Sequence, residues 1–231
     1  MKQLALYLPC CFPNETKFFD VLNLMEKYKV DILELGVPVT NPHMDGAVIR
    51  ESHQQVLNQG FNKADFKQIL ARIKEQYSFK VVVMTYAEGL MEYDLLTSCK
   101  NKMDGLLCVD RTVTIEDFHS PIQIYNEEMT DEVLKEQLEH NRLFAYCMSG
   151  IGKTGSFNHV PNNYMDTMKR IKTFSSIPVY IGFGIKDQRD VASVFANGAD
   201  GAIIGSYFVN LVATSTMEHI ENYLSELKYI R

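Results

Sequence analysis

Residues 30–46, Val-Asp-Ile-Leu-Glu-Leu-Gly-Val-Pro-Val-Thr-Asn-Pro-His-Met-Asp-Gly, join a short apolar run to a polar loop. The run of Val, Ile and Leu is typical of a strand buried on both faces of a parallel sheet. Glu34 lies inside it, where an ionised carboxylate is costly to desolvate unless it is paired or neutralised. Asp45 follows at a turn signal. Two carboxylates in unlike surroundings at the end of one strand suit a division of acid and base roles.

The same alternation of short apolar runs and longer segments of helical period continues along the whole chain. Eight runs are predicted to be strands, at residues 4–9, 30–35, 80–86, 105–109, 121–125, 143–148, 179–182 and 201–204. Helices are predicted between them, at residues 16–28, 64–77, 89–100, 131–140, 164–174, 187–197 and 206–227. Asp187 before one helical segment and Gly198 after it are typical of an N-cap and a C-terminal glycine.

Eight βα repeats predict an α/β protein with a closed (β/α)8 TIM barrel, formed as a single domain by residues 1–231. An open doubly wound sheet is the alternative, but it usually has a glycine-rich turn after the first strand. Residues 10–14 stand there and contain no glycine. Only eleven residues separate Asp110 from Ile122. That is room for roughly two helical turns, so the fourth helix is expected to be truncated or missing.

Composition narrows the function classes. The chain has 231 residues, 46% of them hydrophobic, and a net charge of −6, which argues against a nucleic-acid surface. No apolar stretch approaches the ~20 residues that cross a membrane, and the short apolar start does not fit a signal peptide. The five cysteines form no C-x-x-C pair and are expected to be reduced core thiols. We therefore expect a cytoplasmic protein.

Glycines follow the predicted seventh and eighth strands, at Gly182-Phe183-Gly184 and Gly205-Ser206. Glycine lets backbone N–H groups approach an anion, and a helix that begins at Ser206 directs the positive end of its dipole there. Many barrels bind phosphate at this place. A third glycine-rich loop, residues 150–155, follows the sixth strand. These loops predict a phosphate site.

These motifs resemble the tryptophan synthase alpha subunit family, whose pattern runs roughly L-E-L-G-x-P-[FV]-S-D-P-x-A-D-G-P. The chain keeps Leu33-Glu34-Leu35-Gly36, Pro38, Pro42 and Asp45-Gly46. Further matches are Tyr146 with Thr154-Gly155, Gly182-Phe183-Gly184-Ile185 and Gly205-Ser206. The departures are Asn41 for an acidic residue, Met44 for alanine and Ala47 for proline, and no helix precedes the first predicted strand.

The resemblance implies retro-aldol cleavage of indole-3-glycerol phosphate to indole and glyceraldehyde 3-phosphate. It makes Glu34 the acid/base, Asp45 the acceptor for the indole N–H, and Tyr146 a third catalytic residue that positions Glu34 or the glycerol chain. The residues it implies for substrate binding are Tyr7, Tyr86, Leu107, Val109, Thr154 and Phe183. Those it implies for phosphate binding are Gly155, Gly184, Gly205 and Ser206. No metal or cofactor is implied in this chain, because pyridoxal phosphate belongs to the beta subunit of an alpha–beta–beta–alpha complex.

Two other functions stay open. The changes at Asn41 and Ala47 and the short fourth helix put docking and coupling to the beta subunit in doubt, which leaves a catalytically weak regulatory subunit as an alternative. Another phosphate-sugar barrel enzyme, an isomerase or epimerase, is the other alternative. Such an enzyme typically needs a metal cluster or an Asp pair on other strands, and no His/Asp cluster follows several strands here.

Overall fold

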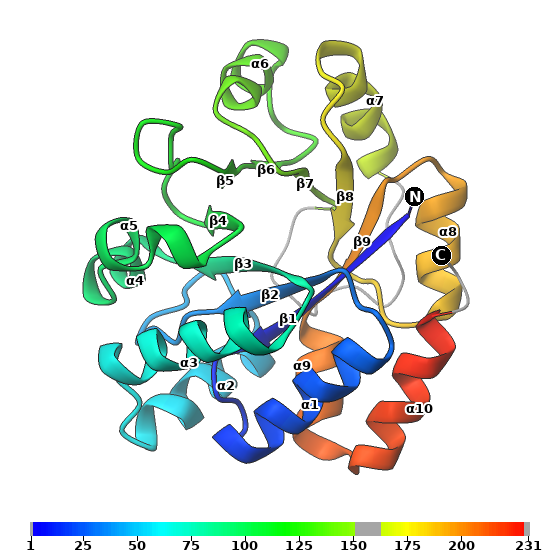
Figure 1. Ribbon diagram of the computed structural model, residues 1–231. Coiled ribbons are helices and arrows are strands. Elements are labelled where there is room, and N and C mark those ends of the chain that lie inside the picture. Colours follow the sequence, from blue (N-terminus) through cyan, green and yellow to red (C-terminus); the bar gives the residue numbers. More distant parts are fainter. Residues whose placement is uncertain (1, 151–162, 229–231) are drawn as a thin grey trace.

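A computed structural model describes residues 2–150 and 163–228, and its strands form one parallel sheet surrounded by helices (Figure 1). The strand order is β5-β4-β3-β2-β1-β9-β8-β7-β6. The strands are β1 Gln3–Pro9, β2 Ile32–Gly36, β3 Lys80–Thr85, β4 Gly105–Cys108, β5 Pro121–Ile122, β6 Ile124–Tyr125, β7 Ala145–Met148, β8 Val179–Gly182 and β9 Gly201–Ile204. They match the eight predicted runs, with the fifth run divided into two.

That division closes the barrel. The two short strands β5 and β6 are separated only by Gln123; β5 pairs with β4, and β6 pairs with β7. The carbonyl of Gln123 also accepts a hydrogen bond from the Tyr146 N–H at 3.1 Å. The single extended segment therefore joins the two ends of the sheet, and the predicted (β/α)8 barrel is confirmed.

The helices lie outside this ring of strands (Figure 1). They are α1 Glu15–Lys27, α2 Ala47–Asn58, α3 Lys63–Gln76, α4 Ala87–Glu92, α5 Leu95–Ser98, the 3-10 helix η1 Lys100–Lys102, α6 Asp131–Glu139, α7 Tyr164–Phe174, α8 Gln188–Ala196, α9 Ser206–Thr214 and α10 Met217–Lys228. Asp187 caps α8 as predicted, accepting hydrogen bonds from two backbone N–H groups, and Gly198 adopts a left-handed φ of 99° after it.

The helices of the structure differ from the predicted ones in three places. Helix α2 was not among the predicted helices. The predicted helix 206–227 is broken by extended Ser215, and Thr216 caps the second piece through its hydroxyl, which accepts from the His219 N–H at 3.3 Å. The predicted helix 89–100 is broken at Asp94, whose φ of 50° lies in the left-handed region.

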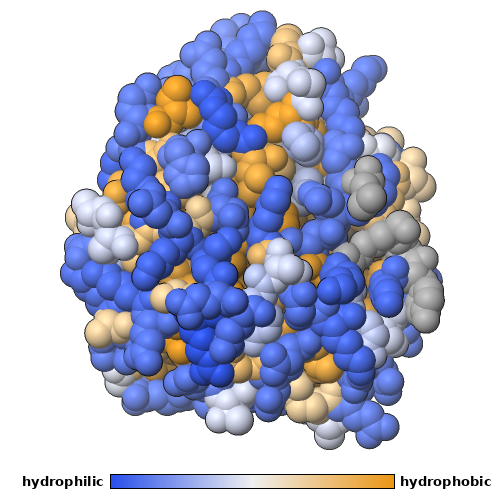
Figure 2. All heavy atoms as spheres, viewed as in Figure 1, coloured by the Kyte–Doolittle hydropathy of each residue, from blue (hydrophilic) through white to orange (hydrophobic). Residues whose placement is uncertain are grey.

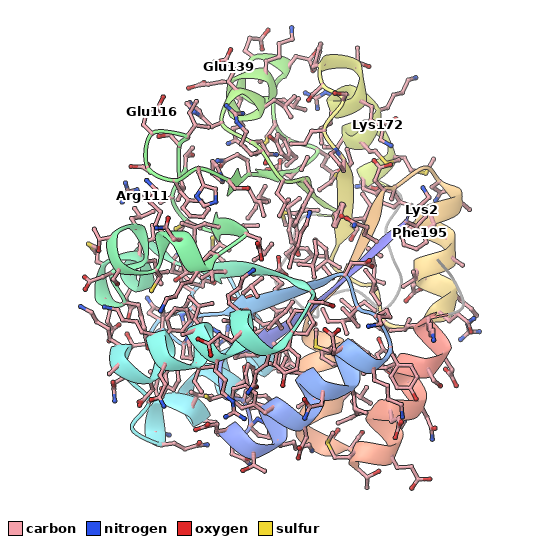
Figure 3. The ribbon with its side chains drawn as sticks, in the orientation of Figure 1. Lys2, Arg111, Glu116, Glu139, Lys172 and Phe195 are labelled. Carbon is pink, nitrogen blue, oxygen red and sulfur yellow. The ribbon has the colours of Figure 1, made fainter. Side chains whose placement is uncertain are left out.

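The segment that follows β4 contains no helix over residues 109–120. Figure 3 labels Arg111 and Glu116 on this segment, which crosses from β4 to β5 as a loop. The expected loss of the fourth helix is confirmed. The outer wall of the barrel beside β4 and β5 therefore has no helix between these two strands to cover it.

The apolar core has two parts. One lies between the strands and the surrounding helices, and the other fills the barrel interior. The interior part consists of Ala5, Ile32, Val82, Leu107, Ile122, Phe144, Tyr146, Tyr180 and Ile203. All five cysteines are buried thiols. The face drawn in Figure 2 is mostly hydrophilic, with apolar side chains in smaller groups between the polar ones. Among the helices of residues 2–150 and 163–228, none has the length and apolar character required to span a bilayer.

Candidate active site

Glu34 is the buried carboxyl group of the barrel interior. It lies on β2 with 1% of its surface exposed, and its Oε1 has no hydrogen-bond partner within the described residues. Burial raises the pKa of Glu34 to about 8, and the negative charge of nearby Asp45 contributes to the same shift. The carboxyl group is therefore mostly protonated at neutral pH and is close to the range where one group can both give and accept a proton.

Asp45 lies in the loop between β2 and α2 and is 6% exposed. Its Oδ2 accepts a hydrogen bond from the Tyr86 hydroxyl at 2.7 Å. The same hydroxyl accepts from the Met44 N–H at 3.3 Å, and Arg50 donates from Nη1 to the carbonyl oxygen of Asp45 at 2.6 Å. These contacts fix the loop so that the second carboxylate faces the first.

Two tyrosines lie across glycines on neighbouring strands. Tyr7 on β1 is the register partner of Glu34, and a Cβ at Gly36 would collide with its hydroxyl. Tyr146 on β7 crosses Gly182 of β8 in the same way. Burial, together with the charges of the two carboxylates, raises the pKa of both tyrosines well above its usual value. Both therefore stay protonated and can donate hydrogen bonds.

Two cavities meet at the carboxyl ends of the strands. The larger has a volume of about 360 Å³, and its lining includes Asp45, Tyr86 and Val109. The smaller has a volume of about 210 Å³ and lies against the start of α9. Tyr146 and Phe183 line both, and their rings meet edge to face at 6.3 Å. One elongated molecule could occupy both cavities.

The smaller cavity has the features of an anion site. Phe183 and Gly184 after β8 have φ values of 77° and 74°, and the Ser149 hydroxyl holds this turn by donating to the Phe183 carbonyl at 2.8 Å. A Cβ at Gly205 would meet no atom of residues 2–150 and 163–228 within 4 Å, so these residues leave open space before it. Helix α9 begins at Ser206, and the first N–H groups of a helix have no partner within it.

A family model described as "Tryptophan synthase alpha chain" matches residues 1–230. The chain belongs to this family. A tryptophan synthase alpha chain from Alkaliphilus metalliredigens is 28% identical over 243 residues, with 98% of this chain and 91% of that protein covered. Another, from Prochlorococcus marinus, is 30% identical over 234 residues, with 93% and 87% covered.

Solved structures of the family share the fold. A chain from the tryptophan synthase a2b2 complex of Pyrococcus furiosus has a TM-score of 0.86 and 26% identity, with 97% of each chain covered. A chain from Mycobacterium tuberculosis tryptophan synthase has a TM-score of 0.85 and 25% identity, with 99% of this chain and 91% of that chain covered.

The alpha-chain fold brings most of the predicted site residues together. Glu34, Asp45, Tyr146, Tyr7 and Tyr86 form one cluster, as their mutual electrostatic effects show. The predicted residues that line the cavities are Asp45, Tyr86, Val109, Tyr146, Phe183, Gly184, Gly205 and Ser206.

Some predicted residues do not line either cavity. Leu107 is fully buried in the barrel interior and lines neither cavity. Glu34 and Tyr7 are buried as well and also line neither cavity. Thr154 and Gly155 lie outside the described residues.

Several polar residues of the site were not predicted from the sequence. His53 hydrogen-bonds Tyr7, Lys186 lines the smaller cavity, and Gln123 lines the larger one. Lys186 directly follows the Gly-Phe-Gly-Ile motif, and that position was a usable signal. His53 had none, because it lies on the helix that was not predicted. Within the described residues, no three His, Cys, Asp or Glu side chains gather into a group that could hold a metal ion.

Proposed function

We propose that this chain, acting as one barrel domain over residues 1–231, cleaves indole-3-glycerol phosphate to indole and glyceraldehyde 3-phosphate. The observation that carries the proposal is the position of Glu34. Its buried, mostly protonated carboxyl group lies close enough to Asp45 and Tyr146 to interact with them electrostatically. Asp45 lines the larger cavity, and Tyr146 lines both that cavity and the smaller one that suits an anion. Membership of the tryptophan synthase alpha chain family supports the same reaction.

The reaction needs a proton at indole C3. In the proposed step, Glu34 gives its proton to C3, and the ring becomes a cation. The carboxylate left on Glu34 then takes the proton of the hydroxyl on the adjacent glycerol carbon. As that proton leaves, the C–C bond breaks, its electron pair neutralises the ring, and the glycerol carbon becomes the aldehyde. Glu34 ends in its starting protonation state, which suits a group whose pKa lies near the working pH.

Asp45 stabilises the ring cation. Its carboxylate accepts the indole N–H, whose positive charge increases when C3 is protonated. The Tyr86 hydroxyl, which donates to Oδ2 at 2.7 Å, keeps the carboxylate in place. Phe183, Val109 and Tyr86 wall the flat ring. Tyr146, which lines both cavities, positions the glycerol chain between them.

The phosphate occupies the smaller cavity. Backbone N–H groups at Gly184, Gly205 and Ser206 surround it at the start of α9, and Lys186 adds a positive side chain to the lining. The family resemblance also implies Thr154 in substrate binding and Gly155 in phosphate binding, and both lie outside the described residues. Binding energy from the distant phosphate group then holds the indole carbon against Glu34.

We further propose that the chain works with a beta subunit that carries pyridoxal phosphate. The similar chain from Pyrococcus furiosus belongs to a tryptophan synthase a2b2 complex that shows mutual activation. Here Asn41, in the loop that carries Asp45, and Ala47, the first residue of α2, depart from the family pattern. Those two changes favour one alternative, a subunit with weak catalysis of its own that chiefly activates the beta subunit.

The test is indole release from indole-3-glycerol phosphate by the purified chain, alone and with its beta subunit. The wild type is compared with Glu34→Gln and with the matched control Glu51→Gln, which changes an exposed glutamate on α2. Release by the wild type and the control, but not by Glu34→Gln, supports the lyase. If the folded wild type releases no indole in either setting yet speeds the reaction of the beta subunit, the regulatory alternative holds.

A further inference from the structure

His53 forms a buried contact behind the candidate catalytic carboxyl group. It lies on α2, is 2% exposed, and its Nε2 is 3.0 Å from the Tyr7 hydroxyl oxygen. Its other ring nitrogen, Nδ1, accepts a hydrogen bond from the Val39 N–H at 3.3 Å. Both ring nitrogens are therefore engaged, one by the backbone and one by a tyrosine that faces the active site.

These two contacts fix the tautomer of the imidazole. A backbone N–H can only donate, so Nδ1 must be the unprotonated nitrogen. Burial lowers the pKa of His53 to about 4, which keeps the ring neutral at physiological pH. A neutral ring with a bare Nδ1 carries its proton on Nε2. His53 must then donate to the Tyr7 oxygen, and the hydroxyl hydrogen of Tyr7 must point away from His53.

Tyr7 is the register partner of Glu34 on the neighbouring strand, and the charges of Asp45 and Glu34 both act on its hydroxyl. The hydroxyl sits over Gly36, which is two residues after Glu34 on β2 and therefore on the same interior face of the barrel. The buried Oε1 of Glu34 has no hydrogen-bond partner within the described residues. A hydroxyl whose hydrogen is turned from His53 is free to direct its positive end to a carboxylate inside the barrel.

We propose that His53 is a positioning residue for the acid/base step, because it orients the Tyr7 hydroxyl so that its hydrogen faces Glu34 and stabilises the ionised carboxylate. The inference rests on the proposed function, in which Glu34 becomes an anion after it protonates indole C3. That anion forms inside an apolar barrel beside the charge of Asp45, so a fixed donor dipole lowers its free energy. The other ionisable groups around His53, Tyr7 and Glu34 are Asp45, Arg50, Tyr86, Glu88 and Tyr146.

The tautomer can be read without any substrate. In ¹⁵N NMR spectra of the full chain labelled at histidine, His53→Gln identifies the His53 signals. We expect Nε2 to show the shift of a protonated nitrogen and Nδ1 that of a bare one, unchanged between pH 6 and 9. A proton on Nδ1, or a doubly protonated ring in that range, would overturn the proposal.

The effect on Glu34 is read from its own titration. Infrared difference spectra follow the carboxyl band that Glu34→Gln removes, so the measurement does not require lyase activity. In Tyr7→Phe, which keeps the ring over Gly36, and in His53→Leu, we expect the midpoint to rise by about one pH unit. His53→Gln keeps an N–H near the position of Nε2 and should stay close to the wild type.

A double mutant separates positioning from packing. If His53 acts only through Tyr7, His53→Leu adds no further shift of the Glu34 midpoint in the Tyr7→Phe background. Equal midpoints in the wild type and Tyr7→Phe would refute the proposal, even if His53→Leu fails to fold. Where the lyase is active, the pH profile of kcat should move with the midpoint. If no indole is released but the midpoints shift as expected, the proposed function fails and the His53–Tyr7 arrangement stands.

Discussion

At the scale of single residues, the proposed chemistry depends on a carboxyl group that burial keeps protonated. Glu34 acts first as an acid, so its protonated form is the active one. Because its pKa is about 8, we predict that kcat/KM for indole-3-glycerol phosphate falls above that pH. Rates measured from about pH 7 to pH 10, above the second pKa of the substrate phosphate at about 6, check this. A profile that instead rises through pH 8 would make the carboxylate the starting form.

The same residue affects the stability of the fold. Burial raises the pKa of Glu34 in the folded chain to about 8, from its ordinary value of 4.5. Between those two values the folded state binds the extra proton, so the stability that this group contributes is lost as pH rises through the window. We predict that Glu34→Gln is more stable than the wild type at pH 8 and that the difference shrinks toward pH 4.5. Urea unfolding at several pH values measures it, and the opposite trend would mean that Glu34 is ionised in the fold.

Loss of the acid should abolish most of the activity without loss of structure. We predict that Glu34→Gln lowers kcat at least ~100-fold, the usual contribution of a positioned acid or base. Asp45→Asn should also lower kcat, because an amide cannot neutralise the ring cation, and it should leave phosphate binding intact. Steady-state kinetics, with inorganic phosphate as a competing ligand, separate the two effects. A mutant that raises only KM would contradict a catalytic role.

At the scale of elements, glycines on the strands make room for the tyrosines of the site. A Cβ at Gly182 would collide with the Tyr146 hydroxyl. We predict that Gly182→Ala displaces the ring, costs about 1–3 kcal/mol of unfolding free energy and reduces kcat. At Gly205 the described residues leave open space, so Gly205→Ala should keep the stability and raise KM for the phosphorylated substrate. Thermal unfolding and kinetics of both variants test this, and equal losses of stability would contradict it.

The elements also explain which parts were predictable. Each strand is a compact apolar run between turn signals, so the strands could be predicted from sequence. Helix α2 could not, because its buried face combines Ile49 and Val56 with the polar Ser52 and His53, and apolar periodicity does not detect such a face. The carboxylate pair was found because Glu34 is conspicuous in an apolar run. His53, the hydrogen-bond partner of Tyr7, was not found, because this contact depends on how α2 packs on the barrel.

At the scale of the whole molecule, closure of the barrel depends on one seam, the segment 121–125 between β4 and β7. This segment joins β4 to β7 through strands of only two residues each, and no helix follows β4 to cover it. Polar side chains stabilise the seam instead. Gln123 donates from Nε2 to the Val113 carbonyl at 2.7 Å, and Asn141 donates from Nδ2 to the Tyr125 hydroxyl at 3.0 Å.

We predict that Gln123→Leu weakens this seam. The substitution leaves the buried Val113 carbonyl without its donor, which costs about 1–3 kcal/mol of unfolding free energy. Amide hydrogen exchange should then increase at residues 122–125 and at Tyr146, whose N–H donates to the Gln123 carbonyl. The increase should be larger than in β1, at the opposite side of the sheet. Gln68→Leu, on the exposed face of α3, is the matched control. Uniform exchange across all strands would show that the barrel opens as a unit, and that the missing helix is compensated by contacts other than this glutamine.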